Sequence, residues 1–154
     1  MTISFTMAPD VSHEKGPPEG AGQDVGAQLR PMLAGAHARG MADVLDLLGM
    51  SAALIDAAGM VLHLNAGAKR LVGRDISMVH AHLMLKDDSE NRALLAMIGA
   101  ALGETPRAGE MMIHGAHGGI RLQALPVTAN ARDGCQLLKA LVLMIPLGDS
   151  ATRA

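Results

Sequence analysis

Aromatic side chains are almost missing from this sequence of 154 residues: Phe5 is the single phenylalanine, and tryptophan and tyrosine do not occur. Proteins that bind single-stranded nucleic acid stack bases on aromatic side chains, and those that bind duplexes gather lysine and arginine. This chain has no basic run, and its formal net charge is −2 at pH 7. We therefore expect no direct nucleic-acid partner.

Cysteine and long apolar stretches are also scarce. The single cysteine, Cys135, has no partner for an internal disulfide, which fits a reducing compartment. No apolar run approaches the roughly 20 residues that span a bilayer, and no basic start followed by a long apolar segment marks a secretory signal. These absences predict a cytoplasmic protein with no membrane partner.

The first part of the chain divides into a polar tail and a helix. Residues 1–26 are rich in proline, glycine and charge without an apolar period, which predicts a disordered tail. Residues 27–48 carry apolar side chains at three- and four-residue spacing, which predicts an amphipathic helix. This helix would cover its own sheet, join two copies of the chain, or do both. The candidate positions for a dimer interface are Leu29, Leu33, Ala36, Gly40, Met41, Val44, Leu45 and Leu48.

The stretch LIDAAGMVLHLNAGAKRLVG, which begins at Leu54, predicts a hairpin followed by a short helix. Asp56 and Gly59 favour a tight turn between two apolar strands, with the Asp56 carboxylate accepting hydrogen bonds from turn amides. Asn65 is typical of a helix N-cap, and Gly73 is expected to end the helix that starts there.

The rest of the chain predicts short extended segments over 76–85, a long helix, and three antiparallel strands. The long helix is expected to begin after a cap at Asp88 or Ser89, and Pro126 is expected at a strand end. The strands VLHL and LVLMI are apolar at nearly every position, so both faces of the sheet need a cover. The fold class is α+β. The expected buried face of the long helix is Leu94, Leu95, Ile98 and Leu102.

These residues resemble a PAS domain. The superfamily pattern is D-x-x-G, a hydrophobic strand, then N-x-x-A-x-x-L-x-G, and the closest similarity is to PAS domains of LuxR-type bacterial transcriptional regulators. The resemblance covers residues 50–146, with a C-terminal tail over 147–154. It implies a five-stranded antiparallel sheet with flanking helices, preceded by the N-terminal helix, and a pocket between sheet and helices. The matching residues are Asp56, Gly59, Asn65, Ala68, Leu71 and Gly73.

The resemblance does not extend to cofactors or to an output segment. Flavin-binding relatives use a cysteine in the helix after the short capped one, and haem-binding relatives place a histidine on or beside the long helix. This sequence matches neither signature, so we expect no cofactor. The helix-turn-helix segment that follows in longer relatives is absent here, so the chain is either a fragment or acts through protein contacts.

Histidines are the most numerous candidates for chemistry. His63 lies in the second predicted strand, where a ligand-contacting or pH-responsive role competes with a plain structural one. His80, His82, His114 and His117 have no accompanying cysteine or acidic cluster that would fix a zinc site. No serine lies in a G-x-S-x-G context. We expect no catalytic residues and no metal ligands.

The sequence therefore predicts a non-enzymatic sensory or protein-interaction module of bacterial signalling or transcriptional regulation, acting as a homodimer or on a regulator protein. A small apolar ligand would enter between the sheet and the long helix, and the N-terminal helix would carry the signal out. The alternatives are a roadblock-type scaffold, whose fold normally finishes with a helix, and a small metal-binding protein or enzyme. The pocket candidates are Leu54, Val61, His63, Leu71, Leu95, Ile98, Ile113, Leu122 and Leu143.

Overall fold

An N-terminal helix precedes short strands and two further helices in the computed structural model, which describes residues 36–115, 118–128 and 136–148. Within these ranges the N-terminal helix spans residues 36–47. The predicted tails, over 1–26 and 147–154, lie largely outside the described residues. The later elements are β1 (Ser51–Ile55), β2 (Val61–Leu64), α2 (Ala66–Leu71), β3 (Ile76–Val79), β4 (His82–Leu85), α3 (Asp88–Leu102), β5 (Gly109–Gly115), β6 (Gly118–Pro126) and β7 (Ala140–Pro146).

The strands form two antiparallel sheets. Five of them lie in the order β2-β1-β7-β6-β5, and β3 pairs with β4 in a separate hairpin. Every neighbouring pair in the large sheet is antiparallel. The predicted α+β class and the five-stranded antiparallel sheet are thus confirmed, and β6 ends at Pro126 as expected.

The turn between β1 and β2 has the hydrogen bonds predicted from its sequence. The backbone N–H groups of Ala58 and Met60 donate to Asp56 Oδ1, both at 2.9 Å. Gly59 has a φ of +79°, in the left-handed region that favours glycine. Helix α2 then begins after Asn65, which is its N-cap as predicted.

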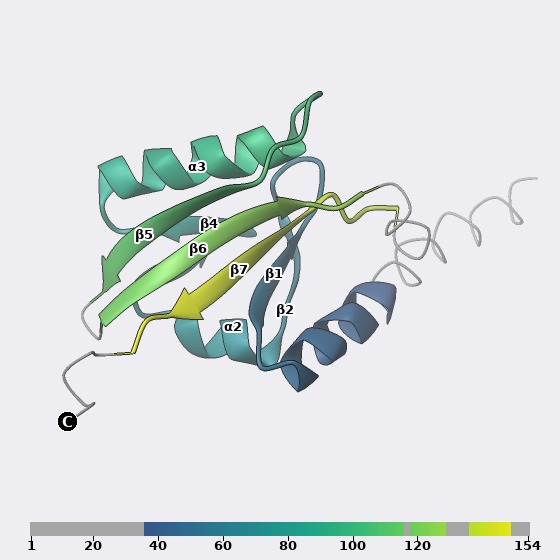
Figure 1. Cartoon of the computed structure of the whole chain (residues 1–154), viewed down its shortest axis with the longest axis horizontal. Helices are drawn as coiled ribbons and strands as arrows, with labels where there is room; N and C mark the ends of the chain where they lie inside the picture. Colours follow the sequence, from purple (N-terminus) through teal and green to yellow (C-terminus); the bar gives the residue numbers. More distant parts are fainter. Residues whose placement is uncertain (1–35, 116–117, 129–135, 149–154) are drawn as a thin grey trace, which may run out of the picture.

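One face of the large sheet, called the inner face here, is covered by α2, α3 and the β3-β4 hairpin. Figure 1 shows α3 running alongside β5 and β6. Leu94 and Ile98 of α3 pack with Ile113, Leu122 and other inward-pointing strand residues in one hydrophobic core. Since each Å² of buried apolar surface contributes roughly 25 cal/mol, this core is the main source of stability.

Helix α3 differs from its prediction in two respects. Its N-cap is Asp87, whose Oδ1 accepts from the N–H groups of Ser89 and Glu90, both at 2.9 Å. The expected cap at Asp88 or Ser89 is therefore wrong by at least one residue. Leu95 is 47% exposed, while the buried side is made by Leu94, Met97, Ile98 and Ala101.

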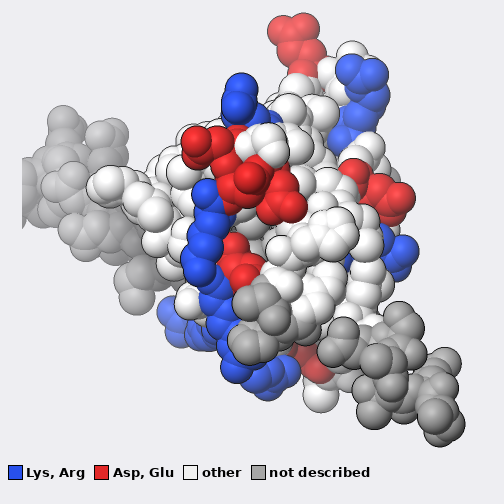
Figure 2. Space-filling view, turned by 90° about the vertical axis from the view of Figure 1, so that its left-hand side faces the viewer, with Lys and Arg blue, Asp and Glu red and all other residues white. Residues whose placement is uncertain are grey.

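Acidic residues at the start of α3 belong to its first turn. Asp88 and Glu90 lie there, beside the amide end of the helix dipole. Figure 2 views the side of the molecule on which α3 begins, and acidic side chains gather there next to a row of lysine and arginine side chains. Hydrogen bonds from the Ser89 hydroxyl and the Glu90 amide hold the pKa of Asp87 below its usual value.

The N-terminal helix covers part of the opposite face, called the outer face here. In Figure 1 it lies, in blue, beside β1 and β2. The expectation that both faces need a cover is confirmed for the β1, β2 and β7 side of the sheet. The small cluster under the helix, called the outer cluster, consists of Ala38, Ala42, Leu54, Val127 and Leu138, edged by Met41, Leu45, Leu62 and Leu141.

The residues predicted to form one apolar face of this helix lie on two different sides of it. Met41 and Leu45 pack against the sheet, together with Ala38 and Ala42, which the spacing did not single out. Small alanines allow a helix to approach a sheet closely, and apolar spacing alone does not single them out. Leu29 and Leu33 lie outside the described residues. The remaining dimer candidates are exposed: Ala36, Gly40, Val44 and Leu48.

Candidate functional site

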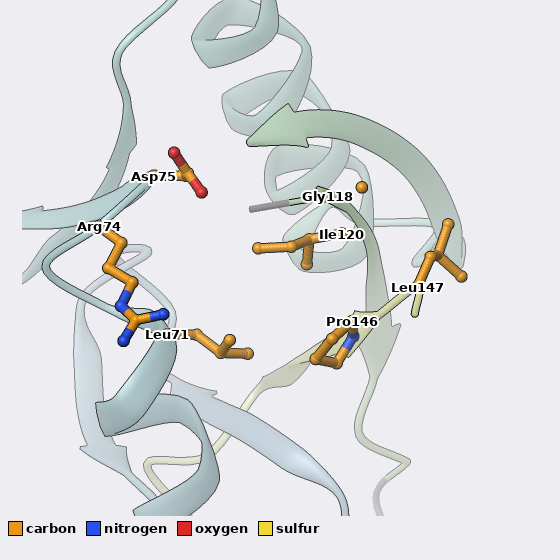
Figure 3. Close-up of a pocket in the computed structure, with 8 residues that line it drawn as sticks. Leu71, Arg74, Asp75, Gly118, Ile120, Pro146 and Leu147 are labelled. Atoms are coloured by element: carbon orange, nitrogen blue, oxygen red, sulfur yellow. The ribbon is translucent and has the colours of Figure 1, made fainter. Parts of the chain in front are cut away.

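A cleft opens at the end of the sheet where β6 begins and β7 ends (Figure 3). The segment around the end of α2 forms one wall, and the ends of β6 and β7 form the other. Its volume is about 180 Å³, and a cavity of roughly 150 Å³ already admits a benzene-sized molecule. The lining of this sheet-end cleft is Leu71, Arg74, Asp75, Gly118, Gly119, Ile120, Pro146 and Leu147.

The cleft combines apolar walls with a cation at its rim. Figure 3 shows Leu71 and Ile120 on opposite sides of the space, with Arg74 beside them. Arg74 is exposed, and Figure 3 shows its guanidinium group pointing away from the Asp75 carboxylate. The carboxylate of Asp75, which also lines the cleft, lies so close to Gly115 that a side chain there would collide with it. The lining therefore suits a small apolar molecule with a negative end.

Helix α2 connects this cleft to the N-terminal helix. Leu71, the last residue of α2, lines the cleft. At the other end of α2, the first two N–H groups donate to a carboxylate outside the helix. The N–H of Ala66 donates to Asp46 Oδ2 at 3.0 Å, and that of Gly67 to Oδ1 at 3.1 Å. These bonds, the one from Ala66 foremost, lower the pKa of the Asp46 carboxyl group. A residue of one helix thus caps the next.

Asn65 joins the same helix to the sheet. Its side chain is 1% exposed, and its Oδ1 accepts from the N–H groups of Ala68 and Ala52, both at 2.9 Å. Its amide group donates to the carbonyl oxygen of Met50. Together with Asp46, it satisfies the first three N–H groups of α2, which a helix cannot satisfy internally.

His63 lies on the outer face, against the N-terminal helix. Burial lowers the pKa of its imidazole, and the positive charges of Lys69 and Arg39 lower it further. Asp43 and Asp46 act in the opposite direction. Burial of the ring therefore disfavours its charged form.

A second hollow of about 200 Å³ lies between the β1-β2 turn and α3. Leu95 and Ile98 form its helical wall, and His82 lies opposite. The His82 Nδ1 is 3.1 Å from the carbonyl oxygen of Gly59, so the imidazole holds the turn. Because its lining includes Leu95 at 47% exposure, this hollow is an open groove on the surface of α3.

The nine predicted pocket residues do not surround one cavity. Ile98, Ile113 and Leu122 lie within the inner core, at most 6% exposed. Val61 and Leu71 pack at its edge. The space predicted as a pocket between the sheet and α3 is filled by these side chains.

The other four predicted pocket residues lie elsewhere. Leu95 borders the open groove on α3. Leu54 belongs to the outer cluster, and His63 is paired with it in the β1-β2 register. Leu143 follows the alternation of β7 onto the outer face as well. The expectation that Leu54, His63 and Leu143 line a pocket on the inner side is therefore wrong.

The residues that do form the cleft and its link escaped the sequence reasoning. Arg74, Ile120 and Pro146 come from three separate segments, and no local pattern announces that they meet. Asp46 caps a helix that begins 20 residues later. An acidic residue near the end of a predicted helix, where it opposes the helix dipole, was the one available signal.

Metal ligands do not come together in the part of the chain that the structure describes. No group of three or more histidine, cysteine, aspartate or glutamate side chains there could hold an ion. None of the described helices has the length and apolar character needed to cross a membrane.

Comparisons with known proteins give little. No family model matches the chain, and no curated protein matches it. Among solved structures, one similar chain is described as the sensor region of a sensor histidine kinase, with a TM-score of 0.49 and 16% identity. The match covers 64% of this chain and 39% of that one, so this chain corresponds to less than half of that protein. A likeness of this size does not assign a family.

Proposed function

We propose that this chain is a non-enzymatic, PAS-like sensory or protein-interaction module of bacterial signalling or transcriptional regulation. The resemblance of residues 50–146 to PAS sequences and the five-stranded antiparallel sheet with helices support the proposal. A small ligand binds in the sheet-end cleft, and the N-terminal helix responds by changing how firmly it docks on the outer face. The module acts from the cytoplasm and needs no cofactor.

The observation that carries this proposal is the position of α2 between the cleft and the N-terminal helix. A ligand beside Leu71 contacts one end of α2, and Asp46 holds the other end. Gly67 packs closely on β1, where an added Cβ would lie 3.2 Å from the Ser51 Cα, so the position of α2 depends on its contact with this strand. A ligand that prefers one position of α2 thereby shifts the docking of the helix.

Output passes through contact with another protein chain. The side of the N-terminal helix that faces away from the sheet exposes Val44 (54%), Leu47 (87%) and Leu48 (67%). Exposed apolar side chains on one side of a helix favour association, either with a second copy or with a regulator protein.

The roadblock alternative lacks the two features that would favour it. A six-residue helix, not a long one, follows the second strand, and a strand is the last of the described elements. For a metal protein, the described residues offer no group of three or more ligands that could hold an ion.

The test is a panel of alcohols, esters and carboxylic acids of about benzene size, screened against the full chain by thermal shift. We expect at least one acid to raise the melting temperature and to change hydrogen exchange in residues 36–47. The variant Arg74→Ala should lose the response to the acid, while Lys86→Ala, an exposed cation away from the cleft, should keep it. If no compound raises the melting temperature, the ligand part of the proposal fails and protein interaction alone remains.

A further inference from the structure

Arg121 is the side chain in the described part of the chain that most needs a partner. It is partly buried in the sheet, and its Nε is buried without any hydrogen-bond partner. No described carboxylate pairs with its guanidinium group. Buried donors are nearly always satisfied in folded proteins, so the unpaired Nε–H sets Arg121 apart from the other described side chains.

The surroundings of Arg121 belong to the part of the outer face that no described helix covers. On β6 it lies opposite Met112 of β5 and Ile145 of β7. Met112 is 46% exposed, and the outer cluster under the N-terminal helix includes no residue of β5 or β6. Arginine and methionine on an open apolar face are typical of the centre of a protein interface.

The nearest acid on this face has only a weak partner. Glu110 lies opposite Gln123, two residues along from the Met112–Arg121 pair. The Gln123 Nε2 donates to Glu110 Oε2 at 3.3 Å, in an exposed position. Glu110 and Arg121 are therefore diagonal neighbours, which lie roughly 7–8 Å apart in a sheet. We call Glu110, Met112, Arg121 and Gln123 the outer patch.

We infer that a second copy of this chain binds face to face on the outer patch. The four residues form the corners of a quadrilateral, and a two-fold axis can lie in the interface plane along its diagonal from Met112 to Gln123. Rotation about this axis exchanges the positions of Arg121 and Glu110. Arg121 of each copy then meets Glu110 of the other, so the interface holds two charge pairs. Met112 and Gln123 each meet their own counterpart, as a two-fold contact requires.

Charge complementarity selects this occupant. The outer patch carries one cation and one acid, and the axis that matches them is available only to an identical surface. The inference rests on the homodimer part of the proposed function and assigns its interface to the outer face of β5 and β6. The exposed side of the N-terminal helix is then left free for a regulator.

The test is a charge-reversal mixing experiment with the full chain, read by analytical ultracentrifugation. We expect the wild type to be a dimer, and Arg121→Glu and Glu110→Arg each to raise the dissociation constant by roughly a hundredfold, because like charges then face each other. An equimolar mixture of the two variants should form a heterodimer, since one patch is acidic and the other basic. Lys86→Glu, an exposed reversal outside the patch, should leave the dimer unchanged.

Each other outcome overturns the inference. A monomeric wild type, reversals without effect, or a mixture that stays monomeric would contradict it. Circular dichroism melting of each variant shows that it is folded. As a second measurement, Met112→Cys in a Cys135→Ser background should form a disulfide-linked dimer, while Met78→Cys, at an equally exposed site (47%), should not. A dimer broken only by Val44→Lys would place the interface on the N-terminal helix, preserving the proposed function and refuting the outer patch.

Discussion

The two faces of the central sheet are covered in different ways. The inner face meets two helices and a hairpin and holds a large core of leucine, isoleucine and methionine. The outer face meets one helix, whose contact residues are two alanines, a methionine and a leucine, and the described part of that face is open over β5 and β6. Free energy from apolar burial therefore lies mostly on one side of the sheet.

This difference separates stability from signalling. The inner core opens only when the protein unfolds, whereas a helix held by a few small contacts opens at lower free energy. Asp46, a charged group, provides much of its specific attachment. The outer face is thus the side on which our proposal places the structural response.

A pair of leucine substitutions should show the difference most strongly. Leu94 and Leu54 are both 0% exposed, on the inner and outer sides respectively. Leu94→Ala should lower the free energy of unfolding by about 4 kcal/mol, because it leaves a cavity in the large core. Leu54→Ala should cost about 2 kcal/mol, because its neighbours Ala38 and Ala42 are small and the helix can shift. Urea denaturation measures both, and equal losses would remove the distinction.

Substitution of Asn65 tests the hydrogen bonds that join α2 to β1. Asn65→Ala removes the partners of Ala52, Ala68 and Met50 at a buried position, which should cost about 3 kcal/mol of unfolding free energy. Asn91→Ala is the matched control, since its side chain accepts one hydrogen bond, from the Leu85 N–H at 3.0 Å. It should cost about 1 kcal/mol. A control that is as damaging as the test variant would show that Asn65 has no special role.

Two glycine substitutions sharpen the comparison through the fit of α2. A Cβ at Gly67 would lie 2.5 Å from the Ser51 Oγ, so Gly67→Ala should destabilise by about 1–2 kcal/mol. Gly99→Ala on α3 meets no atom within 4 Å and should stabilise by about 0.5–1 kcal/mol through helix propensity. Opposite shifts in melting temperature are expected, and shifts of the same sign would contradict the close packing.

The smallest expected effect is the acid response of the outer face. The pKa of His63 in the folded protein is lowered from its usual 6.5. Its contribution to the free energy of unfolding is therefore full above pH 6.5 and is lost as the pH falls below that value. The folded pKa of Asp46 is lowered from 3.8, so its contribution is lost only below pH 3.8. Protection factors of the amides in residues 36–47, which correct for the pH dependence of intrinsic exchange, should therefore fall in two acid steps. His63→Gln should remove the upper step and Asp46→Asn the lower, and an unchanged profile in either variant would refute its assignment.

Local chemistry explains which parts of the fold could be predicted. The Asp56 turn and the Asn65 cap depend on residues within a few positions of each other, so the sequence displays them directly. Strand assignments near the end of the chain succeeded because their apolar residues recur over several positions.

The cleft and the helix contacts could not be predicted, because they depend on residues far apart in the chain. The buried side of the N-terminal helix is set by how closely Ala38 and Ala42 approach the sheet, which apolar spacing alone does not reveal. The inner space was predicted as a pocket, but Ile98 and Ile113 fill it. Arg121 reads as an ordinary solvent-facing residue until the register places it between Met112 and Ile145.

Native-state hydrogen exchange of the full chain, with and without Asp46→Ala, tests most directly whether the N-terminal helix is a separable relay. We expect amides in residues 36–47 to exchange through openings of lower free energy than those of α3. The substitution should accelerate exchange in that helix and at Gly67 while leaving α3 unchanged. If the helix and α3 exchange with the same free energy in both proteins, the helix is part of the core and the relay does not exist.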